Sequence, residues 1–102
     1  MIGKWVVMND KKITTLRANI FGKVQGVGFR AATVRQARLC GVTGWVRNAA
    51  DGSVQVLAQG STDAVDQLLS WLYKGPAAAK VDSVEVIDGY QIDKYFKHFE
   101  WR

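Results

Sequence analysis

The chain has 102 residues, of which 48% are apolar and 23% are charged, the ordinary mixture of a soluble globular domain. This length allows one hydrophobic core and is too short for two. The longest early apolar run, Trp5–Met8, is too short for a signal-peptide core or a membrane span, so we expect a cytoplasmic protein.

The net charge of +5 is unevenly distributed along the chain. Residues 1–50 carry nine Lys or Arg against one acid, a balance of +8, whereas residues 51–102 carry five against eight, a balance of −3. The first half therefore predicts an electropositive region that attracts anions, either small phosphates or nucleic acid. Charge alone does not separate these from an ordinary solvated surface.

The first regular pattern begins after residue 13, so we divide the chain into an N-terminal extension, residues 1–13, and a domain, residues 14–102. Leu16, Ala18 and Ile20 occupy alternate positions, which predicts a strand with one buried face. Three glycines between residues 22 and 28 end this strand. A helix is then expected from about residue 28, and Gly41 is placed to end it. One face of this helix would carry Phe29, Thr33, Ala37 and Cys40.

Two further strands are predicted on either side of a tight turn. Residues 42–48 have a strand-like pattern, and residues 54–58 alternate again. Between them, Asp51-Gly52 is a strong hairpin signal, which makes these two strands antiparallel.

The second half predicts one more helix and two strands. Residues 61–63 offer several N-caps, and apolar residues then recur at helical spacing until Gly75-Pro76 ends the helix. Val84 and Val86 indicate a fourth strand, and Asp88-Gly89 a turn. Alternation at the C-terminal end, with Phe99 and Trp101, predicts a short last strand.

The order strand, helix, strand, strand, helix, strand predicts an α+β fold. We expect a ferredoxin-like split βαβ sandwich, in which an antiparallel sheet carries two helices on one face. This fold hosts many unrelated functions, so it does not decide the activity.

The glycine-rich loop before the first helix carries the chemical signal. Glycines adopt positive φ angles, so successive N–H groups can point to a common centre and bind an anion beside the helix N-terminus. Arg30 falls in the first helical turn, where a positive charge is unfavourable unless an anion lies nearby. A guanidinium can also hold two phosphate oxygens. Loop and Arg30 together predict a phosphate site that needs no metal.

Two better-known phosphate motifs do not fit this loop. Residues 26–31 formally match the dinucleotide-binding pattern G-x-G-x-x-G/A, but the hairpin makes the following strands antiparallel, whereas a Rossmann sheet needs parallel crossovers and a longer chain. A Walker A loop needs a Gly-Lys-Ser/Thr, and none follows.

Two motifs resemble one known family. Gly22–Arg30 (GKVQGVGFR) resembles the signature loop of acylphosphatases. Gly44–Asn48 (GWVRN), followed by Asp51–Val54 (DGSV), resembles the second motif of the same family, at the right distance from the first. The second predicted helix and the C-terminal segment also fit, so the resemblance covers about residues 14–102.

The resemblance implies a role for each matching residue. Arg30 corresponds to the phosphate-binding arginine and Asn48 to the asparagine that positions the attacking water. The backbone N–H groups of the loop correspond to the phosphate-binding loop, which here comprises Val24, Gln25, Gly26, Val27, Gly28 and Phe29. The implied activity is hydrolysis of acyl phosphates to a carboxylate and inorganic phosphate by in-line attack of water. Arg47, beside Asn48, is expected to be a solvated strand residue.

No metal or other cofactor is expected. The lone histidine, His98, and the lone cysteine, Cys40, are too far apart in sequence to suggest a zinc site or a catalytic pair. We expect Cys40 to be a buried small residue, His98 to be structural or solvated, and Asp51 to serve the turn. A carboxylate leaves without being protonated, which is consistent with a site lacking a general acid. We expect a monomer that binds neither nucleic acid nor a membrane.

Two alternatives stay open at this stage. The first is a non-enzymatic RNA- or anion-binding module, since RRM domains share the fold; however, they carry aromatic residues on a central strand, and residues 53–59 contain none. The second is a related domain of a larger carbamoyl-transfer maturation factor, although no zinc-finger cysteines follow here. Salt-sensitive RNA binding without hydrolysis would favour the first, and activity on carbamoyl phosphate alone would favour the second.

Overall fold

The computed structural model describes residues 13–87 and 94–102, and within them five strands and two helices form. In chain order these elements are β1 (Thr14–Lys23), α2 (Phe29–Cys40), β2 (Thr43–Asn48), β3 (Val54–Gly60), α3 (Thr62–Leu72), β4 (Lys80–Ile87) and β5 (Phe99–Trp101). Neither helix is both long enough and apolar enough to span a membrane, among the residues described. The predicted Asp88-Gly89 turn and residues 1–12 of the predicted extension lie outside the described residues, and the division of the chain at residue 13 stays a prediction.

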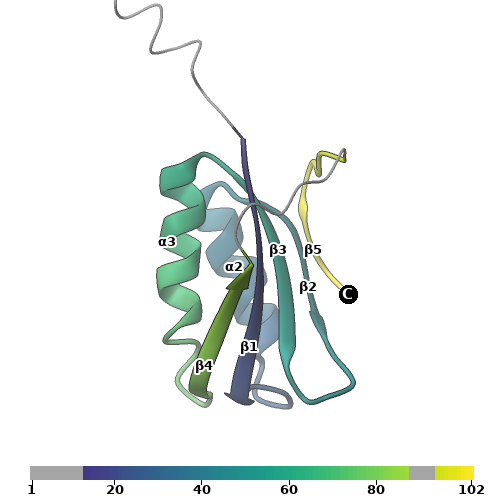
Figure 1. Cartoon of the computed structure of the whole chain (residues 1–102), viewed down its shortest axis with the longest axis vertical. Coiled ribbons are helices and arrows are strands. Elements are labelled where there is room, and N and C mark those ends of the chain that lie inside the picture. The colour runs from purple at the N-terminus through teal and green to yellow at the C-terminus, as the bar shows by residue number, and fades with distance from the viewer. Residues whose placement is uncertain (1–12, 88–93) are drawn as a thin grey trace, which may run out of the picture.

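The strands form one sheet in the order β4-β1-β3-β2-β5 (Figure 1). The four longer strands pair antiparallel, which confirms the predicted split βαβ arrangement. The short β5 instead pairs in parallel with β2, with Gly44 opposite Phe99 and Val46 opposite Trp101. The sheet is therefore mixed, because the last strand returns to the outer edge of β2 rather than forming a hairpin with β4.

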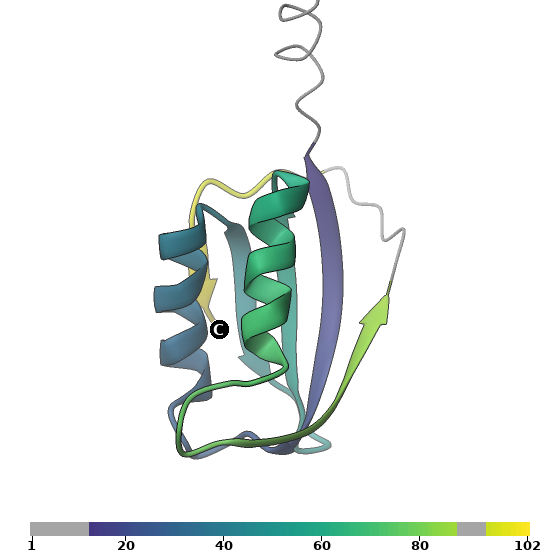
Figure 2. The same cartoon turned by 90° about the vertical axis from the view of Figure 1, so that its left-hand side faces the viewer.

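Both helices cover the same face of the sheet, as predicted (Figures 1 and 2). α2 packs against β2 and β5, and α3 packs against β1 and β3. The core forms between these layers from the alternate, inward-facing positions of the strands and the apolar sides of the helices. Its largest contributions come from Ile20, Val46, Val54, Val56, Phe29, Val65, Leu68 and Leu72, all buried.

The helix ends follow the sequence signals. α2 begins after Gly28, with φ 76°, and ends before Gly41, with φ 78°. Both angles lie in the left-handed region, which glycine adopts without steric cost. α3 is capped by Ser61, whose Oγ accepts a hydrogen bond from the N–H of Ala64 at 3.2 Å. Cys40 is half-buried rather than fully buried, since it is the last residue of α2 and packs against the edge of the core.

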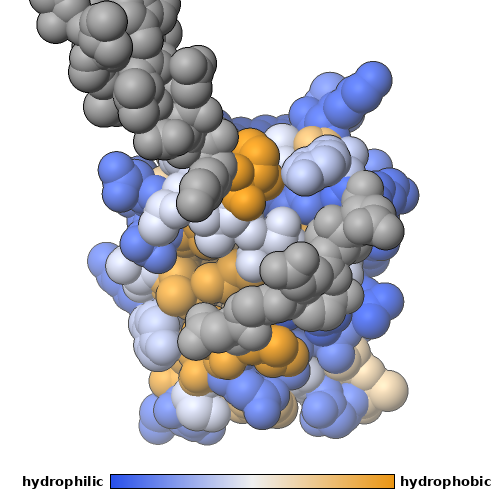
Figure 3. All heavy atoms as spheres, turned by 45° about the horizontal axis from the view of Figure 1, so that its top comes forward, coloured by the Kyte–Doolittle hydropathy of each residue, from blue (hydrophilic) through white to orange (hydrophobic). Residues whose placement is uncertain are grey.

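The helix-free face of the sheet is closed by an aromatic and cationic cluster. Trp45 is only 6% exposed, because the guanidinium groups of Arg17, Arg47 and Arg102 lie over its ring at 5.1, 4.8 and 5.4 Å from the centroid. Figure 3 looks obliquely onto the upper end of the molecule, where hydrophilic side chains at the margins surround a smaller hydrophobic area. The stacked guanidinium groups thus replace a second layer of helices over this tryptophan.

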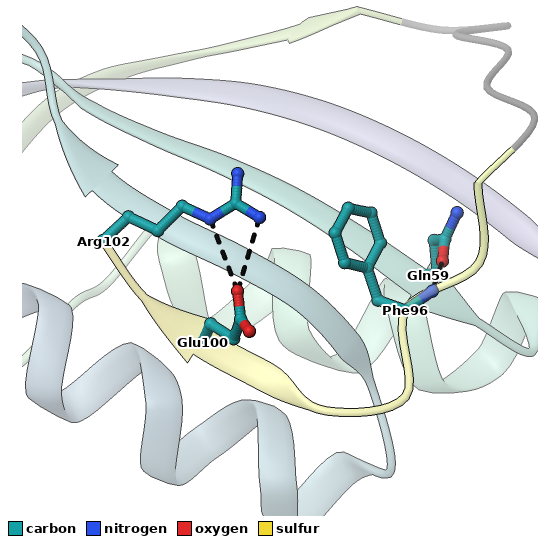
Figure 4. A network of polar contacts seen from close by, with 4 residues as sticks. All are labelled: Gln59, Phe96, Glu100 and Arg102. Carbon is teal, nitrogen blue, oxygen red and sulfur yellow. Dashed lines mark hydrogen bonds and ion pairs between the residues drawn. The ribbon is translucent and has the colours of Figure 1, made fainter.

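Gln59 fixes the segment that leads into β5. Its buried amide donates to the carbonyl oxygen of Lys94 at 2.8 Å. It also accepts from the N–H of Phe96 at 2.9 Å, and this second bond is drawn in Figure 4. Farther along the same segment, Arg102 forms an ion pair with Glu100 at 3.3 Å. The Gln59 bonds attach the start of this segment to β3, and bonds from the Gly44 N–H to the His98 carbonyl oxygen and from the Arg102 N–H to the Val46 carbonyl oxygen hold β5 beside β2.

Gly44 lies where the backbones of β2 and β3 approach closely, and its substitution tests whether this approach requires glycine. It has φ 133°, and a Cβ there would overlap the carbonyl oxygen of Leu57 on β3. We expect Gly44→Ala to lower the free energy of unfolding by about 2–4 kcal/mol, since it adds a backbone overlap to conformational strain. Gly41→Ala is the control: its φ of 78° is also positive, but lies in the left-handed helical region with open space around it, so the change should cost only about 1–2 kcal/mol. Urea unfolding of both variants measures this, and equal losses would contradict the packing argument.

Candidate active site

The strand directions bring three separate segments to one edge of the sheet. β1 and β2 are each antiparallel to β3, and β5 is parallel to β2, so all three strands end on the same side (Figure 1). The loop that follows β1, the end of β2 at Asn48 and the end of β5 at Trp101 therefore meet. The N-terminus of α2 starts from this same edge, since only residues 24–28 separate it from β1.

A small pocket lies where these segments meet. Its volume is about 110 Å³, well below the roughly 300–1,000 Å³ of a pocket for a drug-sized ligand, so it suits a small group such as a phosphoryl. The two residues predicted from the sequence to act on substrate, Arg30 and Asn48, both line it. The full lining is Val24, Gly26, Gly28, Phe29, Arg30, Ala31, Asn48 and Trp101.

The loop side of the pocket is built from backbone. Gly26 and Gly28 have φ angles of 73° and 76°, and a Cβ at either would meet nothing within 4 Å. These positions thus require glycine for its conformation rather than for space. Gly28 gives α2 no side-chain cap, and the first turn of the helix contains no acidic residue. The positive end of the helix dipole is therefore not neutralised by its own side chains.

Arg30 is held from the direction of β5. Its Nη1 donates to the backbone carbonyl oxygen of Arg102 at 3.1 Å, and its guanidinium carbon lies 4.9 Å from the centroid of the Trp101 ring. Guanidinium groups stack favourably on aromatic faces, so these contacts restrict the side chain while leaving further N–H donors available. Sequence reasoning missed Trp101 as a pocket residue, because no local pattern indicates that β5 pairs beside β2.

Asn48 and its neighbour Arg47 point to different sides of the sheet. Asn48 is the last residue of β2 and lines the pocket. Arg47 instead stacks over Trp45, and its Nε donates to Oε1 of Gln55 at 2.8 Å. It is not among the residues lining the pocket, as expected for a strand residue one position away.

Two of the predicted loop residues do not line the pocket. The Gln25 side chain turns toward the β2–β3 hairpin, where its Nε2 donates to the carbonyl oxygens of Ala49 at 2.8 Å and Ser53 at 2.9 Å. Val27 packs against the core. The loop therefore contributes pocket surface at alternate positions, namely Val24, Gly26 and Gly28, and is anchored by the residues between them.

The hairpin beside the pocket is stabilised by Asp51, as the sequence predicted. Its Oδ1 accepts from the Oγ of Ser53 at 2.6 Å and from the N–H of Ser53 at 3.0 Å. These bonds, the side-chain bond first, hold the pKa of Asp51 below its ordinary value. No group of three or more metal-ligating side chains gathers in residues 13–87 and 94–102. His98 is exposed and lies with Arg38 and Lys97 at the opposite end of the sheet.

Comparison with known proteins agrees with the motifs. The family model described as Acylphosphatase matches residues 16–101. The chain belongs to the acylphosphatase family. An acylphosphatase of Bordetella avium is 51% identical over 94 residues, covering 90% of this chain and 97% of the relative. Family membership confirms the resemblance predicted from the sequence and identifies the chain as a hydrolase of this family.

Solved structures share the fold. The structure of an acylphosphatase from Coxiella burnetii superposes with a TM-score of 0.83 at 33% identity, and the match covers 91% of this chain and 96% of that one. The structure of HypF from T. kodakarensis has a TM-score of 0.77 at 24% identity, covering 89% of this chain but only 12% of that chain. The second likeness shows the fold alone. These structural neighbours are consistent with the ferredoxin-like architecture predicted from the sequence.

The lowered pKa of Asp51 predicts a pH dependence. A carboxyl whose pKa is lower in the folded state stabilises the fold above its unfolded pKa, about 3.9, and this contribution is lost as the pH falls through the folded pKa. We expect the Asp51 carboxyl, followed by NMR, to titrate below its ordinary value, and Ser53→Ala to raise that pKa because the main hydrogen bond is lost. An unchanged pKa in Ser53→Ala would show that the Ser53 hydroxyl is not the cause.

Proposed function

We propose that this chain hydrolyses acyl phosphates, compounds with a carboxyl-phosphate anhydride, to a carboxylate and inorganic phosphate by in-line attack of water. The observation that carries this proposal is the pocket in which Arg30, Asn48 and the glycine loop meet at the N-terminus of α2. The relatives named acylphosphatases support the reaction class. The roles of individual residues are our inference from the geometry.

In this proposal the phosphoryl group lies against the loop. Its oxygens accept hydrogen bonds from backbone N–H groups between Val24 and Phe29, and the uncapped helix N-terminus adds a favourable dipole. Arg30 binds two of the oxygens, which also explains a cation in the first turn of a helix. Donors fixed by the fold stabilise the charge that spreads over these oxygens in the transition state.

Asn48 has the right chemistry to orient the nucleophile. Its side chain carries an acceptor oxygen and two N–H donors, so it can hold a water molecule in a defined direction. It lines the pocket from the end of β2, a different element from the loop, so it can act on the nucleophile while the loop holds the phosphoryl group. Alignment of this kind accounts for much of the rate enhancement in phosphoryl transfer.

The pocket suits a leaving group that needs no proton. The described residues that line it include no Asp, Glu, His, Lys or Cys, and hence no evident general acid. A departing carboxylate has a conjugate-acid pKa of about 4, so it leaves unprotonated, whereas an alcohol does not. Among the residues described, those that line the pocket include no carboxylate that could bind a metal ion, so we propose that the reaction is metal-independent. A cytoplasmic location and a monomeric state remain predictions.

The substrate class can be tested with two compounds. We expect rapid hydrolysis of benzoyl phosphate in the presence of EDTA, followed as benzoate release, because neither a metal nor a general acid is required. p-Nitrophenyl phosphate, a monoester, should be hydrolysed at least about 100-fold more slowly for lack of a general acid. Equal rates on the two compounds, or loss of activity in EDTA, would contradict the proposal.

Two substitutions separate phosphate binding from attack. Arg30→Ala should lower kcat/KM by about 10³-fold and abolish competitive inhibition by inorganic phosphate. Asn48→Ala should lower kcat by about 10²–10³-fold while inorganic phosphate still inhibits. Arg35→Ala, exposed on the same helix, and Arg47→Ala, on the other side of the sheet, are the controls and should retain activity. A normal kcat in Asn48→Ala would eliminate the water-orienting role.

A further inference from the structure

The side chain of Gln25 links the two motifs of the site. One amide nitrogen donates to two carbonyl oxygens, those of Ala49 at 2.8 Å and Ser53 at 2.9 Å. Both acceptors belong to the hairpin that begins directly after Asn48. The orientation of the amide follows from its partners, since two carbonyl oxygens can accept only from the NH₂ group. Gln25 thus uses both of its N–H bonds to tie the glycine loop to the segment that carries Asn48.

Of the two segments that Gln25 connects, the glycine-rich loop is the one that needs a contact to hold its conformation. Gln25 directly precedes Gly26, and Gly28 follows two residues later, both with positive φ. Glycine has more backbone freedom than any other residue, so a loop rich in it costs more entropy to hold in one conformation. The half-buried Gln25 side chain supplies a fixed point inside this loop, between the pocket-lining positions Val24 and Gly26.

The two carbonyl oxygens that accept from Gln25 are held in place by the hairpin. The Ser53 carbonyl oxygen also accepts from the N–H of Ala49 at 2.8 Å, and the Ala49 carbonyl oxygen accepts from the N–H of Gly52 at 3.2 Å. Ser53 is 2% exposed, and Asp51 binds its hydroxyl and its N–H. Both carbonyl oxygens that Gln25 contacts are therefore fixed by the turn itself, and a shift of the loop relative to the hairpin breaks both bonds.

We propose that Gln25 is a positioning residue that sets the distance and direction of Asn48 relative to the phosphate loop. This inference rests on the proposed function, in which the loop holds the phosphoryl group and Asn48 holds the water. In-line attack is sensitive to misplacement, and an error of about 1 Å can cost roughly 100-fold in rate. A bound phosphate orders the loop through its backbone N–H groups and Arg30, whereas the place of Asn48 relative to the loop is set by the contacts between loop and hairpin. Loss of the Gln25 contacts should therefore affect kcat much more than phosphate affinity.

The test uses Gln25→Met, which keeps the length of the side chain and removes both donors. We expect kcat for benzoyl phosphate to fall by about 10–100-fold, while the inhibition constant of inorganic phosphate changes by less than about threefold. Gln67→Met, at an exposed position of α3, is the matched control and should behave as the wild type. Circular dichroism and urea unfolding establish that each variant is folded under the assay conditions.

A double-mutant cycle separates positioning from general stabilisation. If Gln25 acts through Asn48, then Gln25→Met should lower kcat by less than about threefold in the Asn48→Ala background. Additive losses, or a normal kcat in folded Gln25→Met beside an active wild type, would overturn the positioning role alone. A wild type that does not hydrolyse benzoyl phosphate would overturn the proposed function and the positioning role together.

Discussion

The shared direction of β1, β2 and β5 is the constraint on which the site depends. Because the three strands end at the same edge of the sheet, the glycine loop, Asn48 and Trp101 meet there, although they are far apart in sequence. The helix that follows the loop starts from the same edge, so its positive end faces the pocket. A reversed β5 would remove Trp101 and the carbonyl oxygen that holds Arg30.

A few polar contacts convert this common edge into a defined geometry. Gln25 joins the loop to the hairpin, and the carbonyl oxygen of Arg102 together with the Trp101 ring holds Arg30 from the other side. Each contact spans at least 24 residues of sequence, so the geometry of the pocket depends on the whole folded sheet. The proposed site offers mainly backbone donors, one guanidinium and one amide, which suits charge stabilisation rather than proton transfer.

Local signals made most of the fold predictable, as well as several of the residues that line the pocket. Positive-φ glycines, the Asp51-Gly52 turn and the helical spacing around Leu68 each act over a few residues, and each appears where the sequence indicated. What could not be predicted depends on pairing between distant segments. The parallel pairing of β5, the stacking of Arg30 on Trp101 and the contact of Gln25 with the hairpin all require the sheet to be assembled first.

The central claim is that this edge of the sheet binds phosphate, and titration with inorganic phosphate tests it most directly. Backbone amide shifts, followed by two-dimensional NMR, should change saturably and most strongly between Val24 and Arg30, and the side-chain amide of Asn48 should respond as well. The basic cluster of Arg38, Lys97 and His98 at the opposite end of the sheet serves as an internal comparison. Larger changes in that cluster than in the loop, or no saturable change in the loop, would contradict the account.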